Sequence, residues 1–287
     1  MKLNEIAIRD PFILPHEGKY YLFGTPAAHC WTEGVGFWVY VSEELETWSD
    51  PIKCFTQTDD FWSDFNYWAP EVHYYNGKFY MFASFYTKDQ SKMRATQILV
   101  SDLPEGPYVV HSEPITPPDW MCLDGTFYVE NGTPYMVFCH EWVQVTDGEI
   151  CAVELSKDLT HAVGEPRLLF KASQPEWAKE GEKRYVTDGP FLYKSGDKLL
   201  MLWSSLANGY IEAIAYSDNG SINGNWKHCK KLLSAPGFDG GHGMLFKAFD
   251  GTLYFTMHAP NNPKNAERPH LFPVREIEDD PFLEIIY

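Results

Sequence analysis

Three aspartates and one histidine are the residues of this sequence whose types and spacing are best suited to acid–base chemistry. Asp10, Asp124 and Asp188 each lie eight residues before a glycine in a predicted turn, and His242 lies nine residues before another. Ala69 has the same place before a fifth glycine. Glycoside hydrolysis needs one carboxylic acid to protonate the leaving oxygen and an opposed carboxylate to activate water or attack carbon. Repulsion among carboxylates at one site raises the pKa of at least one of them, as a general acid requires.

Five short hairpins are the elements that must position these residues. In each, an aromatic or β-branched run is followed by a turn with glycine and then by a second such run, which is the pattern of a β-hairpin. The turn glycines follow one another at intervals of 55 to 64 residues and account for the whole chain. They are Gly18, Gly77, Gly132, Gly196 and Gly251.

A serine after a further strand-like run marks the same repeat. Ser42, Ser101 and Ser156 each lie 24 residues after their turn glycine, and Ser217 lies 21 residues after its own. Each repeat therefore supplies about four antiparallel strands, and five repeats predict an all-β, five-bladed β-propeller. We expect residues 1–287 to form this single domain, closed without an N-terminal strand in the last blade. A β-sandwich would not explain two markers in register, and a parallel β-helix has far shorter repeats.

The first strand of a propeller blade lines the central channel, so the aspartates and His242 are predicted to meet at one end of the axis. An aspartate before glycine or proline is also common in turns, but the same place in three repeats favours a shared site. Loops at this end carry Trp68, His140 and His258, of which the histidines either contact the substrate or are structural. Glu71 is expected to be structural. The sequence thus predicts an acidic well with an aromatic and polar rim.

The composition restricts the classes of function. With 23 Lys and Arg against 40 Asp and Glu, the net charge of −17 disfavours a nucleic-acid or anionic-membrane partner. Aromatic residues make up 16% of the chain, a content typical of all-β proteins and sugar-binding surfaces. The six cysteines are widely scattered and are expected to be free core thiols. The sequence contains no P-loop, G-x-G-x-x-G or G-x-S-x-G motif, no apolar run of transmembrane length and no secretory signal, so we expect a cytoplasmic protein.

Five motifs in order along the chain resemble glycoside hydrolase family 43. They are RDPFI at residues 9–13, WAP at 68–70, LDGTFYVENG at 123–132, DGPFLYK at 188–194 and GGHGMLF at 240–246. The resemblance implies a five-bladed propeller enzyme that removes arabinofuranosyl or xylosyl units from plant-type oligosaccharides with inversion of configuration.

The resemblance also implies roles for individual residues. Asp10 is the expected general base, Asp124 tunes the pKa of the acid and orients it, and Asp188 has the place of the general acid. His242 is expected on the axis near a structural calcium ion, with no cofactor needed for the chemistry. Arg268 is expected to reach toward the sugar.

One residue departs from the family pattern. The acid is usually a glutamate before Gly-Pro, whereas this chain has Asp188, whose side chain is shorter by one C–C bond, roughly 1.5 Å. Either the substrate lies deeper on that side, or another carboxylate is the acid, or the protein is a weak hydrolase. Glu141 is the leading substitute, and Glu180 and Glu182 are less well placed.

Two classes of function remain open on the sequence. The first is an arabinofuranosidase- or xylosidase-type hydrolase with an oligosaccharide substrate. The second is a carbohydrate-binding propeller with weak or no turnover, and related propeller hydrolases of fructosides or galactose-type sugars are a further alternative. Sugar, linkage, exo or endo action and oligomeric state depend on loop shapes and surfaces that these motifs do not specify.

Overall fold

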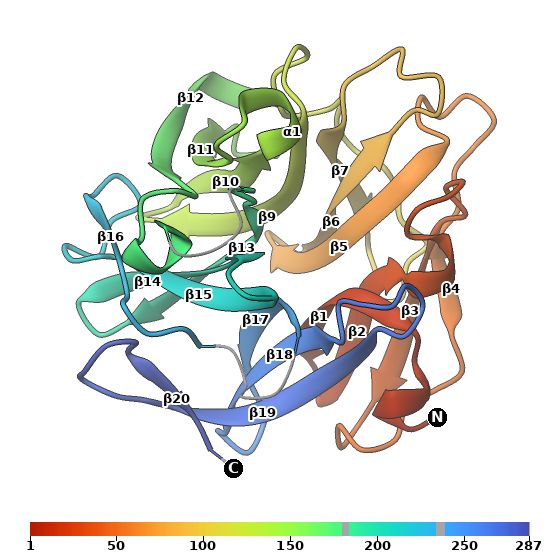
Figure 1. The fold of residues 1–287 in the computed structure, drawn as a ribbon. Helices are drawn as coiled ribbons and strands as arrows, with labels where there is room; N and C mark the ends of the chain where they lie inside the picture. The colour runs from red at the N-terminus through yellow and green to blue at the C-terminus, as the bar shows by residue number, and fades with distance from the viewer. Residues whose placement is uncertain (180–183, 234–238, 287) are drawn as a thin grey trace.

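Five four-stranded antiparallel sheets are arranged radially around a central axis in the computed structural model, as Figure 1 shows. The structure describes residues 1–179, 184–233 and 239–286. Each sheet takes its four strands from consecutive sequence. The predicted five-bladed β-propeller with four strands per blade is therefore confirmed.

The blades are numbered in chain order. Blades one and two contain β1 (Ile8–His16), β2 (Lys19–Pro26), β3 (Phe37–Ser42) and β4 (Ile52–Phe55), then β5 (Phe65–Tyr75), β6 (Lys78–Tyr86), β7 (Ala95–Ser101) and β8 (Val109–Val110). Blade three contains β9 (Cys122–Glu130), β10 (Thr133–His140), β11 (Glu149–Leu155) and β12 (Ala162–Lys171). Blades four and five contain β13 (Asp188–Ser195), β14 (Lys198–Leu206), β15 (Tyr210–Ser217) and β16 (Trp226–His228), then β17 (Gly241–Lys247), β18 (Leu253–Ala259), β19 (Arg268–Glu276) and β20 (Leu283–Ile285).

The helices are short and lie before β1 or in the connections between strands. The 3₁₀ helices are η1 (Leu3–Glu5), η2 (Ala27–His29) and η3 (Glu176–Lys179), and the α-helix is α1 (Trp142–Val145). Within the described ranges, none of these helices is long and apolar enough to cross a membrane.

The turn glycines act through their backbone conformation. In the first hairpin, Glu17 and Gly18 form the two-residue connection with φ of 45° and 79°. Asn76 and Gly77 repeat this arrangement in blade two with φ of 47° and 84°. Two successive left-handed residues match the twist of the flanking strands, and glycine adopts that conformation without steric cost.

The repeated serines lie at the end of the third strand or directly after it, and they bind the turn that follows. Ser42 Oγ accepts the N–H of Leu45 over 2.9 Å, and Ser101 Oγ accepts the N–H of Leu103 over 3.1 Å. A serine hydroxyl that bonds nearby backbone in this way stabilises a turn. This explains why serine recurs at one place in the repeat.

A bulge interrupts the innermost strand of every blade at the same end of the propeller. In blade one, the pairing with β2 passes from Arg9 with Thr25 to Phe12 with Phe23, which leaves Asp10 unpaired. The residue at this place has φ between 47° and 56° in all five blades, and we call it the bulge residue. A bulge bends the strand and re-aims a side chain. The bulge residues are Asp10, Ala69, Asp124, Gly189 and His242.

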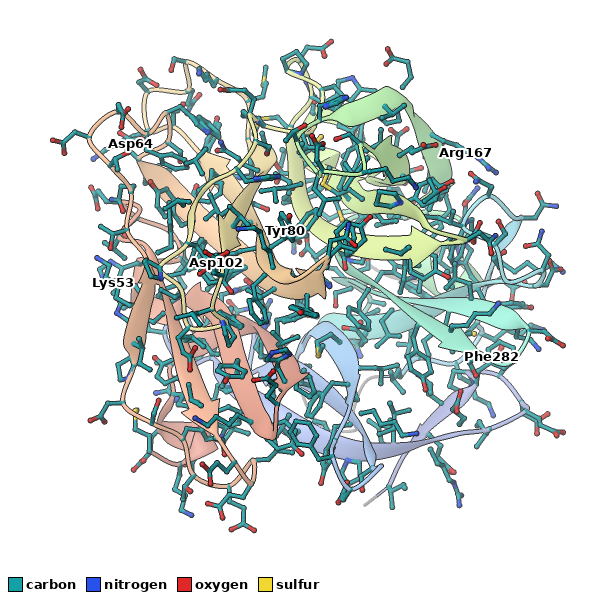
Figure 2. The ribbon with its side chains drawn as sticks, turned by 180° about the vertical axis from the view of Figure 1, so that it is seen from behind. Lys53, Asp64, Tyr80, Asp102, Arg167 and Phe282 are labelled. Carbon is teal, nitrogen blue, oxygen red and sulfur yellow. The ribbon has the colours of Figure 1, made fainter. Side chains whose placement is uncertain are left out.

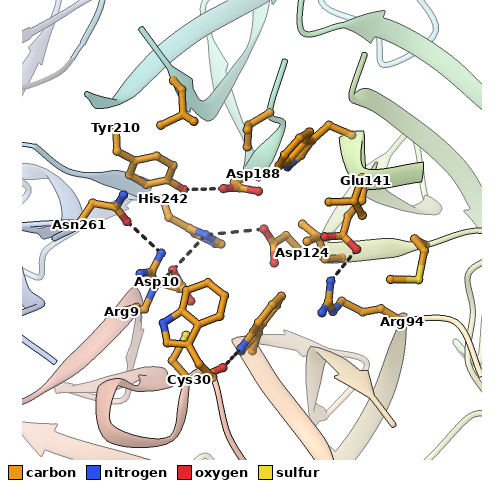
Figure 3. A pocket seen from close by; sticks show the side chains of 18 of the residues that line it. Arg9, Asp10, Cys30, Arg94, Asp124, Glu141, Asp188, Tyr210, His242 and Asn261 are labelled. Atoms are coloured by element: carbon orange, nitrogen blue, oxygen red, sulfur yellow. Dashed lines mark hydrogen bonds and ion pairs between the residues drawn. The ribbon is translucent and has the colours of Figure 1, made fainter. Parts of the chain in front are cut away.

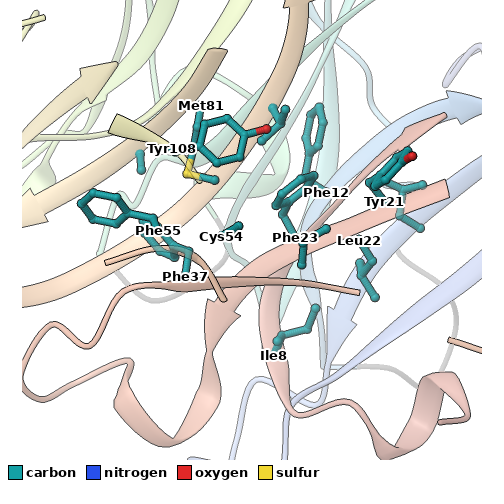
Figure 4. Packing of buried hydrophobic residues seen from close by; sticks show 14 of the residues in the cluster. Ile8, Phe12, Tyr21, Leu22, Phe23, Phe37, Cys54, Phe55, Met81 and Tyr108 are labelled. Carbon is teal, nitrogen blue, oxygen red and sulfur yellow. The ribbon is translucent and has the colours of Figure 1, made fainter. Parts of the chain in front are cut away.

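Apolar side chains fill the space between neighbouring blades. In the cluster that joins blades one and two, Phe23, Phe37 and Met81 are fully buried and pack with Phe55 and Tyr108 (Figure 4). Truncation of a buried phenylalanine to alanine lowers the free energy of unfolding by about 3–5 kcal/mol. These packed side chains therefore hold neighbouring blades together. The six cysteines are free and buried, as predicted.

Blade five packs against blade one without exchanging a strand. Met244 and Phe246 of β17 belong to the same buried cluster as Phe12 and Tyr20 of blade one. The first and last blades lie side by side in Figure 1, and the sheet of blade five is complete on its own. The expected closure without an N-terminal strand is confirmed.

Polar contacts join the outer edges of the blades. Arg167 of β12, labelled near the periphery in Figure 2, donates to the backbone carbonyl of Asn223 in blade four over 2.9 Å. Such exposed contacts contribute little to stability compared with the apolar packing between blades.

Candidate active site

A cavity of about 470 Å³ opens at the end of the propeller where the bulges lie (Figure 3). It is lined by residues from all five blades, and both carboxylates and tryptophans are among them. The inner-strand bulges bring Asp10, Asp124 and Asp188 to one place. Of the residues predicted for the site, the cavity is lined by Asp10, Trp68, Asp124, Glu141, Asp188 and His242.

Asp188 does not have the place in its blade that counting from the turn glycine predicts. It lies directly before the bulge, at the place of Arg9 in blade one, and Gly189 is the bulge residue. Because this bulge lies seven residues before its turn glycine, the eight-residue count selected the preceding residue. His242 is a true bulge residue in spite of its nine-residue offset.

Asp10 is held by several donors. The Thr25 hydroxyl donates to its Oδ2 over 2.6 Å, and its Oδ1 lies 3.2 Å from His242 Nδ1 and 3.8 Å from Arg9 Nε. Its backbone N–H donates to His258 Nδ1 over 3.2 Å. Burial alone would raise the pKa of Asp10, but the charges of His242 and Arg9 and the Thr25 hydrogen bond hold it below its usual value. Asp10 is therefore the ionised carboxylate of the site.

Asp188 lies on the opposite side of His242 and has the opposite electrostatic balance. The Tyr210 hydroxyl donates to its Oδ2 over 3.1 Å. Removal from water raises the pKa of Asp188, and the negative charge of Glu141 adds to this effect. His242 and the Tyr210 hydrogen bond oppose the rise without cancelling it. Asp188 therefore keeps a proton to higher pH than an ordinary aspartate.

Asp124 lies between blades three and four. Its Oδ2 accepts the backbone N–H of Gly189 over 3.0 Å and lies 3.7 Å from His242 Nδ1. Burial is the main cause that raises the pKa of Asp124, and the charges of Asp188 and Asp10 contribute. Asp124 and Asp188 thus titrate as an interacting pair, in which the charge of Asp188 raises the pKa of Asp124.

His242 places an imidazole among these carboxylates. Burial lowers its pKa, but Asp10, Asp124 and Asp188 outweigh that effect and raise it above the usual histidine value. A Cβ on Gly189 would lie 2.6 Å from His242 Cδ2, so only glycine leaves room for the ring. The ring is wedged against the backbone that follows Asp188.

The residues around His242 were also expected to accompany a calcium ion. Calcium binds six to eight oxygen ligands, whereas His242 Nδ1 faces carboxylates that already accept hydrogen bonds from Thr25 and Gly189. Across the part of the chain that the structure describes, no group of three or more His, Cys, Asp or Glu residues is suited to hold a metal ion. These side chains do not fit a calcium ion held by protein ligands, and the expected ion stays a prediction.

Glu141, the substitute acid suggested by the sequence, is engaged by a buried arginine. Arg94 Nη1 donates to Glu141 Oε2 over 2.6 Å, and its guanidinium lies 4.0 Å from the centre of the Trp68 ring and 4.8 Å from that of Tyr86. Burial raises the pKa of Glu141, against the opposing effect of Arg94. The ion pair joins blades two and three and backs the tryptophan that lines the cavity.

Two histidines expected at the rim have other partners. His140 stacks on Trp120 with ring centres 4.2 Å apart and contacts Glu149 over 3.1 Å, and it is not among the residues that line the cavity. His258 is fully buried, and burial lowers its pKa to about 3, so it is a neutral ring that accepts the Asp10 N–H. His258 contacts the candidate base rather than the cavity.

Arg268 is also directed elsewhere. Its guanidinium donates to the backbone carbonyls of Asn4 and Glu267 over 3.1 and 2.7 Å, so it supports the loop before β19 and does not line the cavity. Glu180 and Glu182 lie outside the described residues.

Sequence reasoning missed two arginines that line the cavity. Arg9 directly precedes Asp10 in the RDPFI motif and bonds Glu267 over 3.1 Å and Asn261 over 3.1 Å. The motif was the available signal for Arg9. Arg94 lies in the connection between β6 and β7, and no pattern in that segment indicates that it reaches Glu141 in the next blade.

Comparisons with known proteins agree with this geometry. The family model described as "Glycosyl hydrolases family 43" matches residues 5–277. A structure titled as an endo-arabinase from Bacteroides thetaiotaomicron VPI-5482 is 38% identical, with a TM-score of 0.88 and coverage of 97% of this chain and 98% of that one.

Two curated proteins are also similar in sequence. A "Xylosidase/arabinosidase" of Bacteroides ovatus is 25% identical over 70% of this chain and 74% of that protein. An "Extracellular endo-alpha-(1->5)-L-arabinanase 1" of Bacillus subtilis (strain 168) is 31% identical, but the match covers 28% of this chain and 25% of that protein. With the family model matched over nearly the whole chain and the propeller site in place, this protein belongs to glycosyl hydrolases family 43.

Proposed function

We propose that this family 43 glycosidase hydrolyses arabinofuranosyl or xylosyl linkages in plant-type oligosaccharides, with inversion at the anomeric carbon. The observation that carries the proposal is that Asp10 and Asp188 line one cavity with different partners, since Asp10 lies beside the cations His242 and Arg9 whereas Asp188 accepts a hydrogen bond from Tyr210. The pKa of Asp10 is lowered and that of Asp188 is raised, which is the division of roles that a base and an acid need.

Asp10 is the proposed general base. Its Oδ2 is occupied by the Thr25 hydroxyl and its Oδ1 lies beside His242, so the carboxylate is fixed in orientation before substrate binds. It takes a proton from a water molecule as that water attacks the anomeric carbon. In an inverting enzyme the base and the acid lie about 6.5–9.5 Å apart to leave room for this water.

Asp188 is the proposed general acid, which protonates the departing glycosidic oxygen. Tyr210 orients its carboxyl group, and Asp124, fixed by the Gly189 N–H, lies beside the backbone that carries it. Glu141 is less suited to the role because its Oε2 is engaged by Arg94 Nη1 over 2.6 Å. We infer that the substrate lies deeper on this side to reach the shorter acid.

The proposed sugars follow from the relatives. An endo-arabinase structure at 38% identity and a xylosidase/arabinosidase at 25% both support a pentose at the cleaved bond. The aromatic wall supports a carbohydrate ligand, since Trp31 and Trp68 line the cavity with ring centres 5.3 Å apart. Exposed indole faces stack on the apolar faces of sugar rings.

A substrate panel with product analysis tests the proposal. Aryl arabinofuranosides, aryl xylosides, arabino-oligosaccharides and xylo-oligosaccharides are incubated with the wild-type protein, and released sugars are separated and followed by NMR. We expect pentose release with first-formed product of inverted configuration. Retained configuration would overturn the mechanism, and sugar binding without turnover by a folded preparation would support the carbohydrate-binding alternative.

A further inference from the structure

The five bulge residues are tied to the preceding blade by a repeated hydrogen bond. In four blades, the N–H of the bulge residue donates to a side chain on the second strand of the blade before it. That acceptor always pairs with the residue directly before the bulge of its own blade. The four contacts are Ala69 N–H to Thr25 Oγ1 at 2.7 Å, Asp124 N–H to Ser84 Oγ at 2.8 Å, His242 N–H to Ser204 Oγ at 2.6 Å and Asp10 N–H to His258 Nδ1 at 3.2 Å.

Blade three is the exception, because Cys139 has the acceptor's place there. Cys139 pairs with Leu123, directly before the bulge residue Asp124. A thiol is a weak hydrogen-bond acceptor, and the Gly189 N–H donates instead to Asp124 Oδ2 over 3.0 Å. A carboxylate has thus replaced the hydroxyl as the partner of the next blade.

Blade one shows what a hydroxyl at this place does to a neighbouring aspartate. Thr25 Oγ1 accepts the N–H of Ala69 over 2.7 Å and donates its own proton to Asp10 Oδ2 over 2.6 Å. The hydroxyl therefore stands between the carboxylate and the next blade. In blade three there is no such spacer, and Asp124 contacts the backbone of blade four directly.

We propose that Cys139 is a positioning residue. Because its thiol does not take the Gly189 N–H, that N–H binds Asp124 and holds the carboxylate against the backbone next to Asp188. The consequence for turnover rests on the proposed function, whereas the geometric statement does not. Cys139 has no solvent exposure and packs with Leu123 and Ile150. A role in packing alone would make serine and alanine at this place equivalent apart from stability.

The test compares Cys139→Ser with Cys139→Ala, since both remove the thiol and only serine adds a hydroxyl. In crystal structures, we expect the serine hydroxyl to accept the Gly189 N–H and donate to Asp124, in the manner of Thr25. The alanine variant should keep the contact between Asp124 and Gly189. Retention of that direct contact in the serine variant would overturn the proposal. Cys139→Thr provides a second hydroxyl variant if the serine protein does not fold.

The dependence of kcat on the leaving group is a measurement that a role in packing alone would not change. With Asp124 withdrawn by a spacer, the acid loses its positioned neighbour, and misplacement of a reacting group by about 1 Å can cost up to 10²-fold. We expect the serine variant to lose about tenfold in kcat on substrates with poor leaving groups and less than about twofold on activated aryl glycosides. The alanine variant should keep the wild-type leaving-group dependence, and equal behaviour of the two variants would contradict the proposal. If the wild-type protein hydrolyses no glycoside, the proposed function fails, and the two crystal structures still decide the placement of Asp124.

Discussion

Asp10 and Asp188 face one cavity but differ in their neighbours, so each substitution has a distinct expected effect. Asp10→Asn keeps the shape of the base and leaves an oxygen for the Thr25 hydroxyl, but an amide cannot take a proton from water. We expect turnover to fall by about 10²–10⁴-fold, with the unfolding temperature and sugar affinity close to wild type. Steady-state kinetics and calorimetric titration with an oligosaccharide check this. Substantial activity in a clean preparation would remove Asp10 from the base role.

The acid is identified by its dependence on the leaving group. Asp188→Ala should reduce hydrolysis of substrates with poor leaving groups far more than that of activated aryl glycosides, whose departing oxygen needs little protonation. Glu141→Gln is the matched comparison, because it removes the charge bonded to Arg94 and keeps an acceptor oxygen there. It should lower activity on both substrate types in similar proportion. A selective loss in Glu141→Gln would assign the acid to blade three.

The site residues show how far single positions can be predicted. Asp10 and Asp124 were found from their place before the turn glycines, because their hairpins have equal length. Asp188 was found by the same count although Gly189 has the bulge position. Arg268 was misplaced and Arg94 was missed, since the direction of a long side chain in a loop depends on contacts with other blades that local sequence does not encode.

At the scale of the element, β16 contains a histidine whose surroundings disfavour its protonated form. His228 is packed against Phe170 and Trp203, with ring centres 4.8 and 5.9 Å away, and among the described residues neither ring nitrogen has a hydrogen-bond partner. Burial lowers its pKa from 6.5 to about 4. As the pH falls, the unfolded chain therefore binds a proton at His228 before the folded protein does. The contribution of neutral His228 to stability is complete above pH 6.5 and declines until about pH 4.

His228→Phe should remove this acid sensitivity. The lost stability amounts to about 3 kcal/mol, because the pKa is lowered from 6.5 to about 4 and each unit corresponds to about 1.4 kcal/mol. Thermal unfolding from pH 7 to pH 4 should show a smaller decline for the variant than for wild type. His161→Phe, at an exposed histidine, serves as the control and should follow the wild-type curve. Parallel declines of His228→Phe and wild type would contradict the prediction.

The strands themselves were predictable because their signals are local. Left-handed turn residues such as Gly77 recur in the first hairpin of every blade. Serines such as Ser42, which bind the following turn, recur where the third strand stops in blades one to four. The bulges left no comparable signal. They depend on a side chain of the preceding blade that accepts the N–H of the bulge residue, and this side chain lies far away in sequence.

At the scale of the whole molecule, the ring is closed by side-chain packing between its first and last blades. Phe246 is buried there, with ring centres 6.1 Å from Tyr20 and 5.5 Å from Tyr254. Phe246→Ala should destabilise the protein by about 3–5 kcal/mol, seen as a lower denaturant midpoint. Val163→Ala, at an exposed residue of β12, is the control and should change stability by less than about 0.5 kcal/mol. Similar midpoints for both variants would mean that closure of the ring does not depend on the packing of Phe246.

The bond between Asp10 and His258 also has a consequence for a chain that is still being synthesised. Asp10 is translated long before His258, which accepts its N–H, and before His242, which lies beside its carboxylate. By residue 188 all three aspartates have been translated. The base nevertheless stays without two of its neighbours until the last blade docks. Completion of the ring is therefore also the moment at which a nascent chain acquires its assembled base.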